Sequence, residues 1–532
     1  MAEPTQMADS PEMAEQPQRS GRLARSTAFF SIATGASRVA GLVREVVAAS
    51  YFGVKGPMSA FTIAFQVPNL VRSLFADAAI QAAFVPVFTE QLEKGNKREA
   101  FRLASTLIFV VTLLLGAITA LFILAAPIVI PIFAPGFHGH IEDLTIALSR
   151  LLFPILILLG TTGLIVGVLN SYERFAAFAI SPLFWNVAII AVLVGLAPAF
   201  PKGKQIYAYA IGVLVGTVIQ LAIPAWDLRH TPFRFTRSFD WRHPNVRRVL
   251  ILMLPVTISL GLINFNLVIN SFFGTLVDDR APAAIDKAFR IYMLPQGIFS
   301  VAVATVLFPT LARFAARGAY GDLRATMANG MRQIVLLLVP AAAAILVLAE
   351  PMIRLVYQRG EFDASQTHIV AVALFWFSFS LPFNGLFLLL TRTFFSLQRP
   401  WVPSAISAAN LAVTALAALA LYHLGVGGIV ASTAIATAAS VLAQTIVLRR
   451  QLGSLELTKL ISTSSRVLIG SAALAGISYA VWHGLDSALG RSFSGQLISL
   501  TAALAAGALV YFGAIWAMRV PELTQLLRIV RR

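Results

Sequence analysis

The stretch "LAAPIVIPIFAPG" (residues 124–136) has a counterpart in the second half of the chain, "LAEPMIRLVYQRG" (residues 348–360). In both, a proline is followed nine residues later by a glycine. Flanking landmarks recur at intervals of 9, 32, 9 and 38 residues in the first copy and 9, 33, 9 and 39 in the second. These landmarks are Pro86, Gly95, Pro127, Gly136 and Arg174, and then Pro309, Gly318, Pro351, Gly360 and Arg399. Four matched intervals in series indicate an internal repeat.

The repeat is embedded in a strongly apolar chain. Its 532 residues are 58% hydrophobic and 12% charged, with a mean hydropathy of +0.79, which is typical of an integral membrane protein. Fourteen apolar stretches are each long enough to cross a hydrocarbon core of about 30 Å as a helix. We expect these spans at 26–53, 58–91, 101–130, 142–170, 176–198, 206–227, 246–277, 283–313, 322–349, 365–392, 401–422, 427–450, 461–485 and 496–518.

The repeat also predicts the architecture. Each copy holds six spans, and an even number returns the chain to the same side, so the copies are parallel and related by an axis along the membrane normal. The predicted fold class is an all-α integral membrane protein of about 14 transmembrane helices, with two parallel six-helix repeats plus two extra C-terminal helices. The expected domains are a disordered cytoplasmic tail (1–25), an N-terminal bundle (26–230), a C-terminal bundle (231–450), and the last two helices with a basic cytoplasmic tail (451–532).

Charge sets the expected orientation. The 41 lysines and arginines outnumber the 24 acids and give a formal net charge of +17. Most of them fall on one side of the predicted topology, which places both termini in the cytoplasm. The connector "RHTPFRFTRSFDWRHPNVRR" (residues 229–248) is expected to orient the protein and contact anionic lipid headgroups, so a nucleic-acid partner is not expected.

Several function classes lack their sequence signatures. The chain has no GxxxxGK[ST] phosphate loop, so we expect no ATPase of its own. It has no cysteine, and its seven histidines show no metal-ligand spacing. No large external loop carries the paired carboxylates expected of a membrane glycosyltransferase. These absences favour a secondary transporter without enzymatic activity, cofactor or metal.

Cationic side chains recur at membrane depth, where an arginine costs about 2.5–3.5 kcal/mol on insertion scales. The set is Arg38, Arg44, Arg72, Arg150, Lys287, Arg290 and Arg332. Arg150 and Arg332 lie early in their spans and can extend to the headgroups. Arg290 can pair with Asp286 one helical turn away. Arg38 lies about 18 Å along its helix and should face protein or water.

Besides Asp286, the acidic residues at comparable depth are few, namely Glu45, Asp77 and Glu350, so mutual neutralisation cannot account for all of these cations. The surplus positive charge indicates a hydrated cavity that receives an anion. Arginine suits a phosphate or pyrophosphate, because its planar fork binds two oxygens at once.

A polar face follows the span at 246–277. Ser259, Asn266 and Asn270 recur at spacings of seven and four, which places them on one side of a helix. They either line the cavity or form hydrogen bonds between helices, and the sequence favours neither.

Four stretches resemble the MurJ (MviN) family of lipid II flippases, within the polysaccharide and multidrug exporter (MOP) superfamily. They are "SRVAGLVREVVAASYFG" (37–53), "PNLVRSLFADAAIQAAFVPVF" (68–88), "LAAPIVIPIFAPGF" (124–137) and "FRIYMLPQGIFSVAVATVLFPTLARF" (289–314). The resemblance implies a flippase of the bacterial cytoplasmic membrane that moves the undecaprenyl-pyrophosphate-linked peptidoglycan precursor to the outer leaflet by alternating access. Its implied partners are that lipid-linked glycan, membrane lipids and cell-wall synthesis proteins.

The resemblance also implies residue roles. The family's functional arginines fall on Arg38, Arg44, Arg72 and Arg290, which would bind pyrophosphate in a central cavity. The last two spans would form a groove for the polyprenyl tail. The remaining candidates for lining the cavity are Ser59, Asp77, Ser259, Asn266 and Asn270.

The chain departs from the family pattern at two positions, and other functions remain open. Ser59 and Met293 stand where the family often has acidic residues. The alternatives are a flippase for another polyprenyl-linked glycan, such as an O-antigen or capsule unit, and a non-transporting membrane scaffold for cell-wall synthesis. A cation-coupled drug exporter is disfavoured, because that chemistry needs buried carboxylates.

Overall fold

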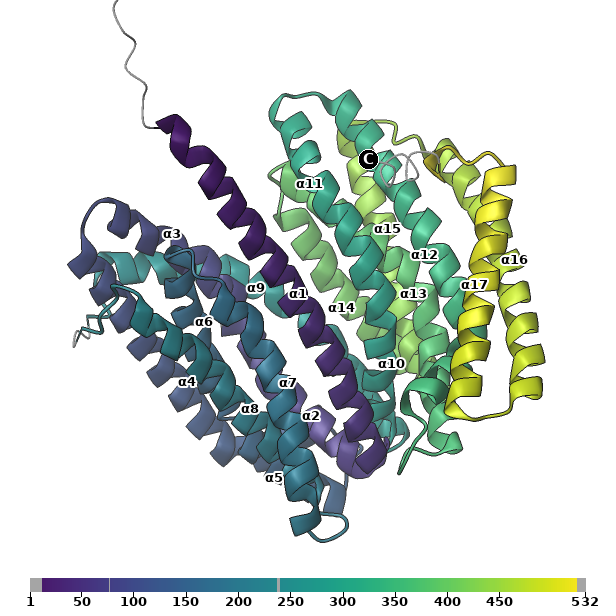
Figure 1. The fold of residues 1–532 in the computed structure, drawn as a ribbon, viewed down its shortest axis with the longest axis horizontal. Helices are drawn as coiled ribbons and strands as arrows, with labels where there is room; N and C mark the ends of the chain where they lie inside the picture. Colours follow the sequence, from purple (N-terminus) through teal and green to yellow (C-terminus); the bar gives the residue numbers. More distant parts are fainter. Residues whose placement is uncertain (1–11, 76, 237–239, 524–532) are drawn as a thin grey trace, which may run out of the picture. The chain divides into compact units, whose positions relative to one another are not determined.

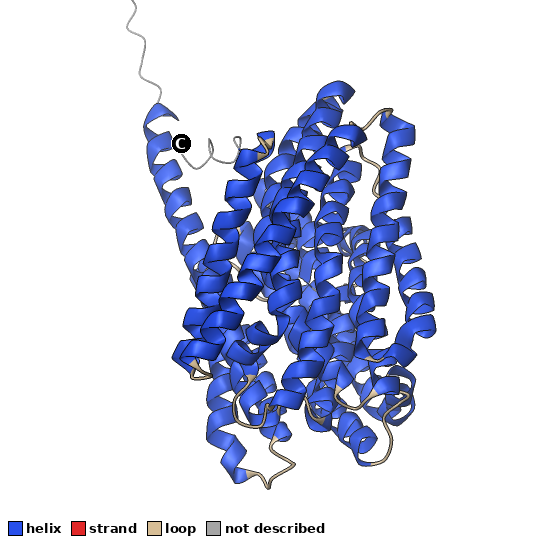
Figure 2. Ribbon diagram, turned by 90° about the vertical axis from the view of Figure 1, so that its right-hand side faces the viewer, coloured by secondary structure: helices blue, strands red, loops and turns tan. Residues whose placement is uncertain are grey.

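The computed structural model describes residues 12–75, 77–236 and 240–523, and their regular elements are helical throughout (Figures 1 and 2). The α-helices are α1 (Glu12–Phe52), α2 (Gly56–Phe75), α3 (Asp77–Glu93), α4 (Lys97–Phe133), α5 (His140–Leu152), α6 (Ile155–Ser171), α7 (Ala176–Leu196), α8 (Ile206–Asp227), α9 (Pro244–Val277), α10 (Ala281–Pro295), α11 (Val301–Ala316), α12 (Tyr320–Tyr357), α13 (Ala364–Ser396), α14 (Trp401–Leu421), α15 (Val426–Leu452), α16 (Leu457–Leu489) and α17 (Phe493–Ala517). Short helices are η1 (Ala197–Ala199), η2 (Leu228–His230), η3 (Gln296–Ser300) and η4 (Tyr422–Leu424).

The prediction of an all-helical membrane protein is confirmed. Within the described residues, eleven helical segments are long and apolar enough to cross a membrane. The three remaining predicted spans correspond to α1, to α2 with α3, and to α9. Two further spans are interrupted, because α5 and α6 divide at Pro154 and a π-helical turn follows Pro295 between α10 and α11. Proline lacks the N–H that continues the helical hydrogen-bond ladder, which explains both interruptions.

The first helix begins inside the segment 1–25, for which the sequence predicts disorder. Helix α1 begins at Glu12, and residues 1–11 lie outside the described part of the chain. Alanine, glutamate, methionine and arginine favour helix, and extending an existing transmembrane helix needs no new nucleus.

Contacts between residues divide the chain into two compact units. The first contains residues 1–47, 72–121 and 151–257, and the second contains residues 48–71, 122–150 and 258–532. Helices α1, α2, α4, α5 and α9 therefore contribute residues to both units. Because the second unit includes segments from both copies of the repeat, this division differs from the predicted bundles at 26–230 and 231–450, which stay a prediction.

Small residues bring helices together in the first unit. A Cβ added at Gly216 of α8 would lie 2.9 Å from the carbonyl oxygen of Trp185 on α7, and one at Gly212 would lie 3.1 Å from that of Ile189. The indole Nε1 of Trp185 donates a hydrogen bond of 3.2 Å to Thr217 Oγ1. Lipid tails are as apolar as the helices, so the hydrophobic effect does not drive helices together in a membrane. Helices associate there through close backbone packing and side-chain hydrogen bonds of this kind.

In the second unit, α16 and α17 lie side by side and are attached to α12 near both of its ends. Arg354 near the end of α12 forms a 2.6 Å ion pair with Asp486 of α16, and both side chains are largely buried. Arg332, nearer the start of α12, pairs with Glu522 beyond α17 and lies 3.6 Å from Glu456. These ion pairs fasten the two extra helices to the second repeat.

A tight turn links α9 to α10 outside the membrane-spanning segments. The Asp278 carboxylate accepts hydrogen bonds from the backbone N–H of Arg280 at 2.7 Å and from its guanidinium at 2.9 and 3.0 Å. The hydrogen bond from the Arg280 side chain lowers the pKa of Asp278 to about 2. Burial raises the pKa of the adjacent Asp279, and its hydrogen bond with Asp278 adds to that effect. The turn thus fixes where α10 begins.

Removing one partner of the Arg354–Asp486 pair should destabilise the protein. Arg354→Ala leaves a buried carboxylate without its cation, and we expect a loss of about 3 kcal/mol. The double variant Arg354→Met with Asp486→Leu should recover most of that loss, because an apolar pair carries no desolvation penalty. Thermal unfolding in detergent, followed by tryptophan fluorescence, measures both. An Arg354→Ala variant that unfolds at the wild-type temperature would show that the ion pair does not hold α16, and a double variant no more stable than Arg354→Ala would show that the unpaired carboxylate is not the cause of the loss.

The Asp278–Arg280 turn predicts a dependence of stability on pH. The pKa of Asp278 is lower in the folded chain than its unfolded value of about 3.9. The contribution of the Asp278 carboxylate to the free energy of unfolding is therefore complete above about pH 3.9 and is lost as the pH falls toward about 2. Asp278→Asn should therefore lower the unfolding temperature at pH 7, and the gap from wild type should narrow below about pH 4. Unfolding temperatures measured at pH 7, 5, 4 and 3 test this expectation. A gap that is constant across this range would contradict it.

Candidate functional site

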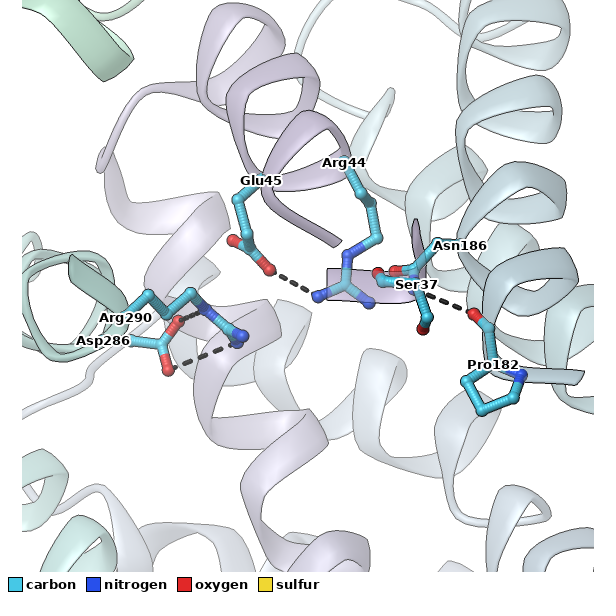
Figure 3. Close-up of polar contacts among 7 residues, drawn as sticks. All are labelled: Ser37, Arg44, Glu45, Pro182, Asn186, Asp286 and Arg290. Carbon is cyan, nitrogen blue, oxygen red and sulfur yellow. Dashed lines mark hydrogen bonds and ion pairs between the residues drawn. The ribbon is translucent and has the colours of Figure 1, made fainter. Parts of the chain in front are cut away.

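Arg44, the second arginine of the first span, is buried with its partners in the first unit. Its guanidinium Nη2 donates to Glu45 Oε1 at 2.5 Å (Figure 3), and its Cζ lies 4.6 Å from the ring centroid of Trp185 on α7. Arg44 is 7% exposed and Glu45 is 3% exposed. A carboxylate and the face of an indole together offset much of the cost of removing a guanidinium from water.

The same face of α1 is fixed to α7 through Asn186. The Asn186 side-chain amide donates to the carbonyl oxygen of Pro182 at 2.9 Å and to that of Ser37 on α1 at 3.4 Å (Figure 3). Pro182 lacks an N–H, which frees the carbonyl of Phe178, and the Ser181 hydroxyl donates to it at 3.3 Å. Local hydrogen bonding around a proline therefore positions the helix that carries Trp185.

The other predicted residues of the first unit are less completely described. Arg38 lies on α1 with an exposed side chain. Arg72 lies on α2 and Asp77 begins α3, but their side chains lie outside the described residues. The same holds for the side chain of Ser259 on α9, which belongs to the second unit.

Arg290 lies on α10 in the second unit and pairs with Asp286, as the sequence indicated. Its Nε donates to Asp286 Oδ2 at 3.0 Å, and its Nη2 lies 3.5 Å from Oδ1 (Figure 3). The arginine side chain is 37% exposed, so it keeps access to water. Met293 is also exposed, so an apolar side chain stands where the family often has a charged one.

Ser59 has a role that the sequence analysis did not predict. It is fully buried on α2, and its Oγ accepts a 3.2 Å hydrogen bond from the backbone N–H of Ala283. Ala283 lies in the first turn of α10, where backbone N–H groups lack partners within the helix. Ser59 therefore satisfies the start of the helix that carries Arg290, which a short hydroxyl does without the cost of a buried charge.

Asn266 and Asn270 form hydrogen bonds between helices. Asn266 Nδ2 donates to Asn410 on α14 at 3.0 Å, and Asn410 continues to Ser440 on α15 at 2.9 Å. Asn270 Oδ1 accepts from Thr433 on α15 at 3.2 Å. Of the two interpretations left open by the sequence, these contacts favour packing between helices.

Lys287 was recognised as a cation at membrane depth but not as a site candidate. It is fully buried on α10, and its Nζ lies 5.7 Å from the ring centroid of Tyr357 at the end of α12. Its position one turn before Arg290 places a second cation in this part of α10.

An apolar cavity of about 490 Å³ opens between α12, α13 and α16. Its lining is almost entirely apolar and includes Val339, Leu346, Phe379, Phe383, Leu468 and Ala475. Residue patterns could not reveal it, because membrane helices are apolar on most faces. The cavity has the chemistry of a site for hydrocarbon, and α16, the first of the two extra helices, forms one of its walls.

The arrangement can bind anions but gives no sign of metal binding. Arg44 pairs with Glu45 and Arg290 pairs with Asp286, and a ligand with several phosphate oxygens could share these guanidinium groups. Within the described ranges, no group of three or more histidine, aspartate or glutamate side chains is placed to hold a metal ion.

Separating the charge of Arg44 from its pairing gives a test of this geometry. Arg44→Ala leaves the Glu45 carboxylate buried without its cation, and we expect a stability loss of about 3 kcal/mol. Adding Glu45→Gln should restore much of the loss, because no unpaired charge remains. Arg38→Ala, on an exposed side chain of the same helix, serves as the control and should have little effect. If Arg44→Ala unfolds no earlier than Arg38→Ala, the pair does not stabilise α1.

Comparison with known proteins assigns the family. The sequence model of lipid II flippase MurJ matches residues 48–501. A probable lipid II flippase MurJ of Rhizobium meliloti (strain 1021) is 32% identical over 96% of both chains, and the lipid II flippase MurJ of Burkholderia cenocepacia is 31% identical over 71% of this chain and 74% of its own.

Solved structures agree in fold. A lipid II flippase MurJ in an inward closed conformation has a TM-score of 0.77 at 22% identity, covering 94% of this chain and 99% of its own. An inward-facing multidrug transporter of the MATE family has a TM-score of 0.64 at 16% identity, covering 79% of this chain and 96% of its own. The breadth of the sequence match settles the assignment: this chain belongs to the MurJ family of lipid II flippases.

Proposed function

We propose that this chain carries lipid II, the undecaprenyl-pyrophosphate-linked peptidoglycan precursor, from the inner to the outer leaflet of the bacterial cytoplasmic membrane. The observation that carries the proposal is the family match over residues 48–501, joined by a relative that is 32% identical over nearly the whole length. Transport would follow alternating access, in which the headgroup crosses within the protein while the tail remains in lipid.

The arginines would supply the contact with the diphosphate. Arg38, Arg44 and Arg72 belong to the first unit and Arg290 to the second. Arg38 is exposed and available to a ligand, whereas Arg44 and Arg290 are held by Glu45 and Asp286 until a ligand competes. A diphosphate can make bidentate, charge-assisted contacts with these guanidinium groups, and sharing each guanidinium with its carboxylate would avoid leaving that carboxylate unpaired. Pairing in the empty state would keep these guanidinium groups in position at a lower desolvation cost.

The apolar cavity between α12, α13 and α16 suits part of the polyprenyl tail. It offers hydrocarbon contacts and almost no polar surface. The ion pairs at Arg332 and Arg354 hold α16 and α17 against α12 and so preserve the cavity wall. A tail held there would keep the lipid attached while the headgroup moves.

The membrane potential would drive export. With both termini in the cytoplasm and the interior negative, outward movement of an anion gains about 2.3 kcal/mol per charge for each 100 mV. At 100 mV, outward movement of a diphosphate with two negative charges would be favoured by about 4–5 kcal/mol. A secondary transporter without a phosphate loop can use the membrane potential directly. Cell-wall synthesis enzymes would then consume the exported lipid II and would not supply the energy for its transport.

Flipping of lipid II by the purified protein tests the proposal. In proteoliposomes with an imposed interior-negative potential, wild type should expose fluorescent lipid II to an external quencher, and the rate should fall at least tenfold when Arg38, Arg44, Arg72 and Arg290 are all alanine. Arg150→Ala is the matched control, because Arg150 donates to the backbone carbonyl of Ile123 and lies outside the proposed anion site. A quadruple variant that flips at the wild-type rate would refute the arginine mechanism. Transport of another polyprenyl-linked glycan in place of lipid II would keep the mechanism and change the substrate.

A further inference from the structure

The two glycines that end the repeated stretches have equivalent contacts. Gly136 follows α4 in the first copy, and Gly360 follows α12 in the second. The backbone N–H of Gly136 donates a 3.2 Å hydrogen bond to Thr275 Oγ1, near the end of α9, which is the first helix of the second copy. Gly360 lies against the carbonyl oxygen of Ser50, near the end of α1, which is the first helix of the first copy. Each copy thus places its glycine against the first helix of the other copy.

Both approaches leave no room for a side chain. A Cβ added at Gly136 would lie 1.9 Å from the carbonyl oxygen of Thr275 and 2.7 Å from the backbone nitrogen of Leu276. A Cβ at Gly360 would lie 2.3 Å from the carbonyl oxygen of Ser50. The obstructing atoms are backbone, so a side chain could fit only if a helix end moved. Gly360 also has a φ of +60°, which favours glycine, whereas at Gly136 the contact alone explains the residue.

Polar contacts reinforce the Gly360 side. The backbone N–H of Glu361 donates to the carbonyl of Ser50 at 2.9 Å, and the Glu361 carboxylate pairs with Lys55 at 2.5 Å. Gln366, which is 3% exposed, accepts a 2.7 Å hydrogen bond from the backbone N–H of Val54. Its own amide group is held by the carbonyl of Glu361 at 3.0 Å. A buried amide bridging two segments 312 residues apart in sequence makes this side the better fastened of the two.

These contacts join the two copies of the repeat within a single compact unit. The second unit contains 48–71 and 122–150 from the first copy together with the second copy. The four contacting helices, α1, α4, α9 and α12, are the first and third spans of each copy. Spans of odd number end on the same side of the membrane, and that side is external if the N-terminus is cytoplasmic.

We propose that Gly136 on Thr275 and Gly360 on Ser50 form a paired latch that closes the external side, and that both contacts separate to release the headgroup. The release of the headgroup by this latch rests on the proposed function, whereas the two glycine contacts themselves do not depend on it. Glycine suits such a latch, because backbone surfaces meet without ordering long side chains and separate without leaving an apolar side chain in water. Repeat symmetry would allow the two contacts to open in one motion of the copies.

The absence of cysteine from the chain makes the latch directly measurable. Ala49→Cys places a thiol at a fully buried position beside Ser50. In nanodiscs, its labelling by a hydrophilic maleimide should be slow. Thr275→Ala, which removes one hydrogen bond of about 1 kcal/mol, should speed labelling about fivefold, and Gly136→Ala or Gly360→Ala should speed it further.

Matched glycines control for effects on the backbone. Gly139 has a φ of +58°, close to that of Gly360, but nothing lies within 4 Å of its added Cβ. Gly321, like Gly136, has no positive φ, but nothing lies within 4 Å of its added Cβ, so it is the control for Gly136. Gly139→Ala and Gly321→Ala should leave the labelling rate unchanged. Equal acceleration in these controls, or no acceleration in Gly136→Ala and Thr275→Ala, would overturn the latch.

A reversible disulfide across the Gly360 contact tests the latch independently of which substrate is transported. Oxidation of Ser50→Cys with Glu361→Cys, which are joined by a backbone hydrogen bond, should stop lipid II flipping while lipid II still binds, and reduction should restore flipping. Flipping that continues in the oxidised variant would contradict the latch. If wild type flips no lipid II, the labelling rates still decide whether the latch exists, so the two proposals fail independently.

Discussion

The structure depends on how a guanidinium is accommodated among membrane helices. An uncompensated arginine at membrane depth costs several kcal/mol, and a helix bundle has little free energy to absorb such costs. Here Arg44 is enclosed by Glu45 and Trp185, Arg290 by Asp286, and Arg354 by Asp486. Pairing makes these charges tolerable, and under the proposed function it would also keep the guanidinium groups of Arg44 and Arg290 in position for an anionic ligand.

Pairing of arginine with a carboxylate serves two different purposes in this chain. At α12, the pairs at Arg332 and Arg354 connect distant parts of the second unit and fasten the two extra helices. At α1 and α10, the carboxylate partner is one or four residues away on the same helix, so these two ion pairs do not by themselves join distant segments. Arg44 contacts a second helix through the ring of Trp185 on α7.

Sequence patterns predicted the fold well, because membrane spans depend on length and apolar composition, and the repeat depends on spacing alone. The Arg290–Asp286 pair was also predictable, since helical periodicity places residues four apart on one face. The Arg44–Glu45 pair was not, because adjacent residues of a helix point in different directions and only their long side chains meet. The contact between Gln366 and Val54, the capping of α10 by Ser59, and the cavity beside α16 arise from tertiary packing, which no local pattern records.

The central claim is that this chain exports a diphosphate-linked cell-wall precursor, and depletion in the bacterial host tests it most directly. After depletion, lipid extracts would be analysed for the precursor that accumulates, with its leaflet assigned by accessibility to an external enzyme. The account predicts lipid II held in the inner leaflet, followed by lysis. Continued appearance of lipid II in the outer leaflet at the normal rate, in a host with no second flippase, would contradict it.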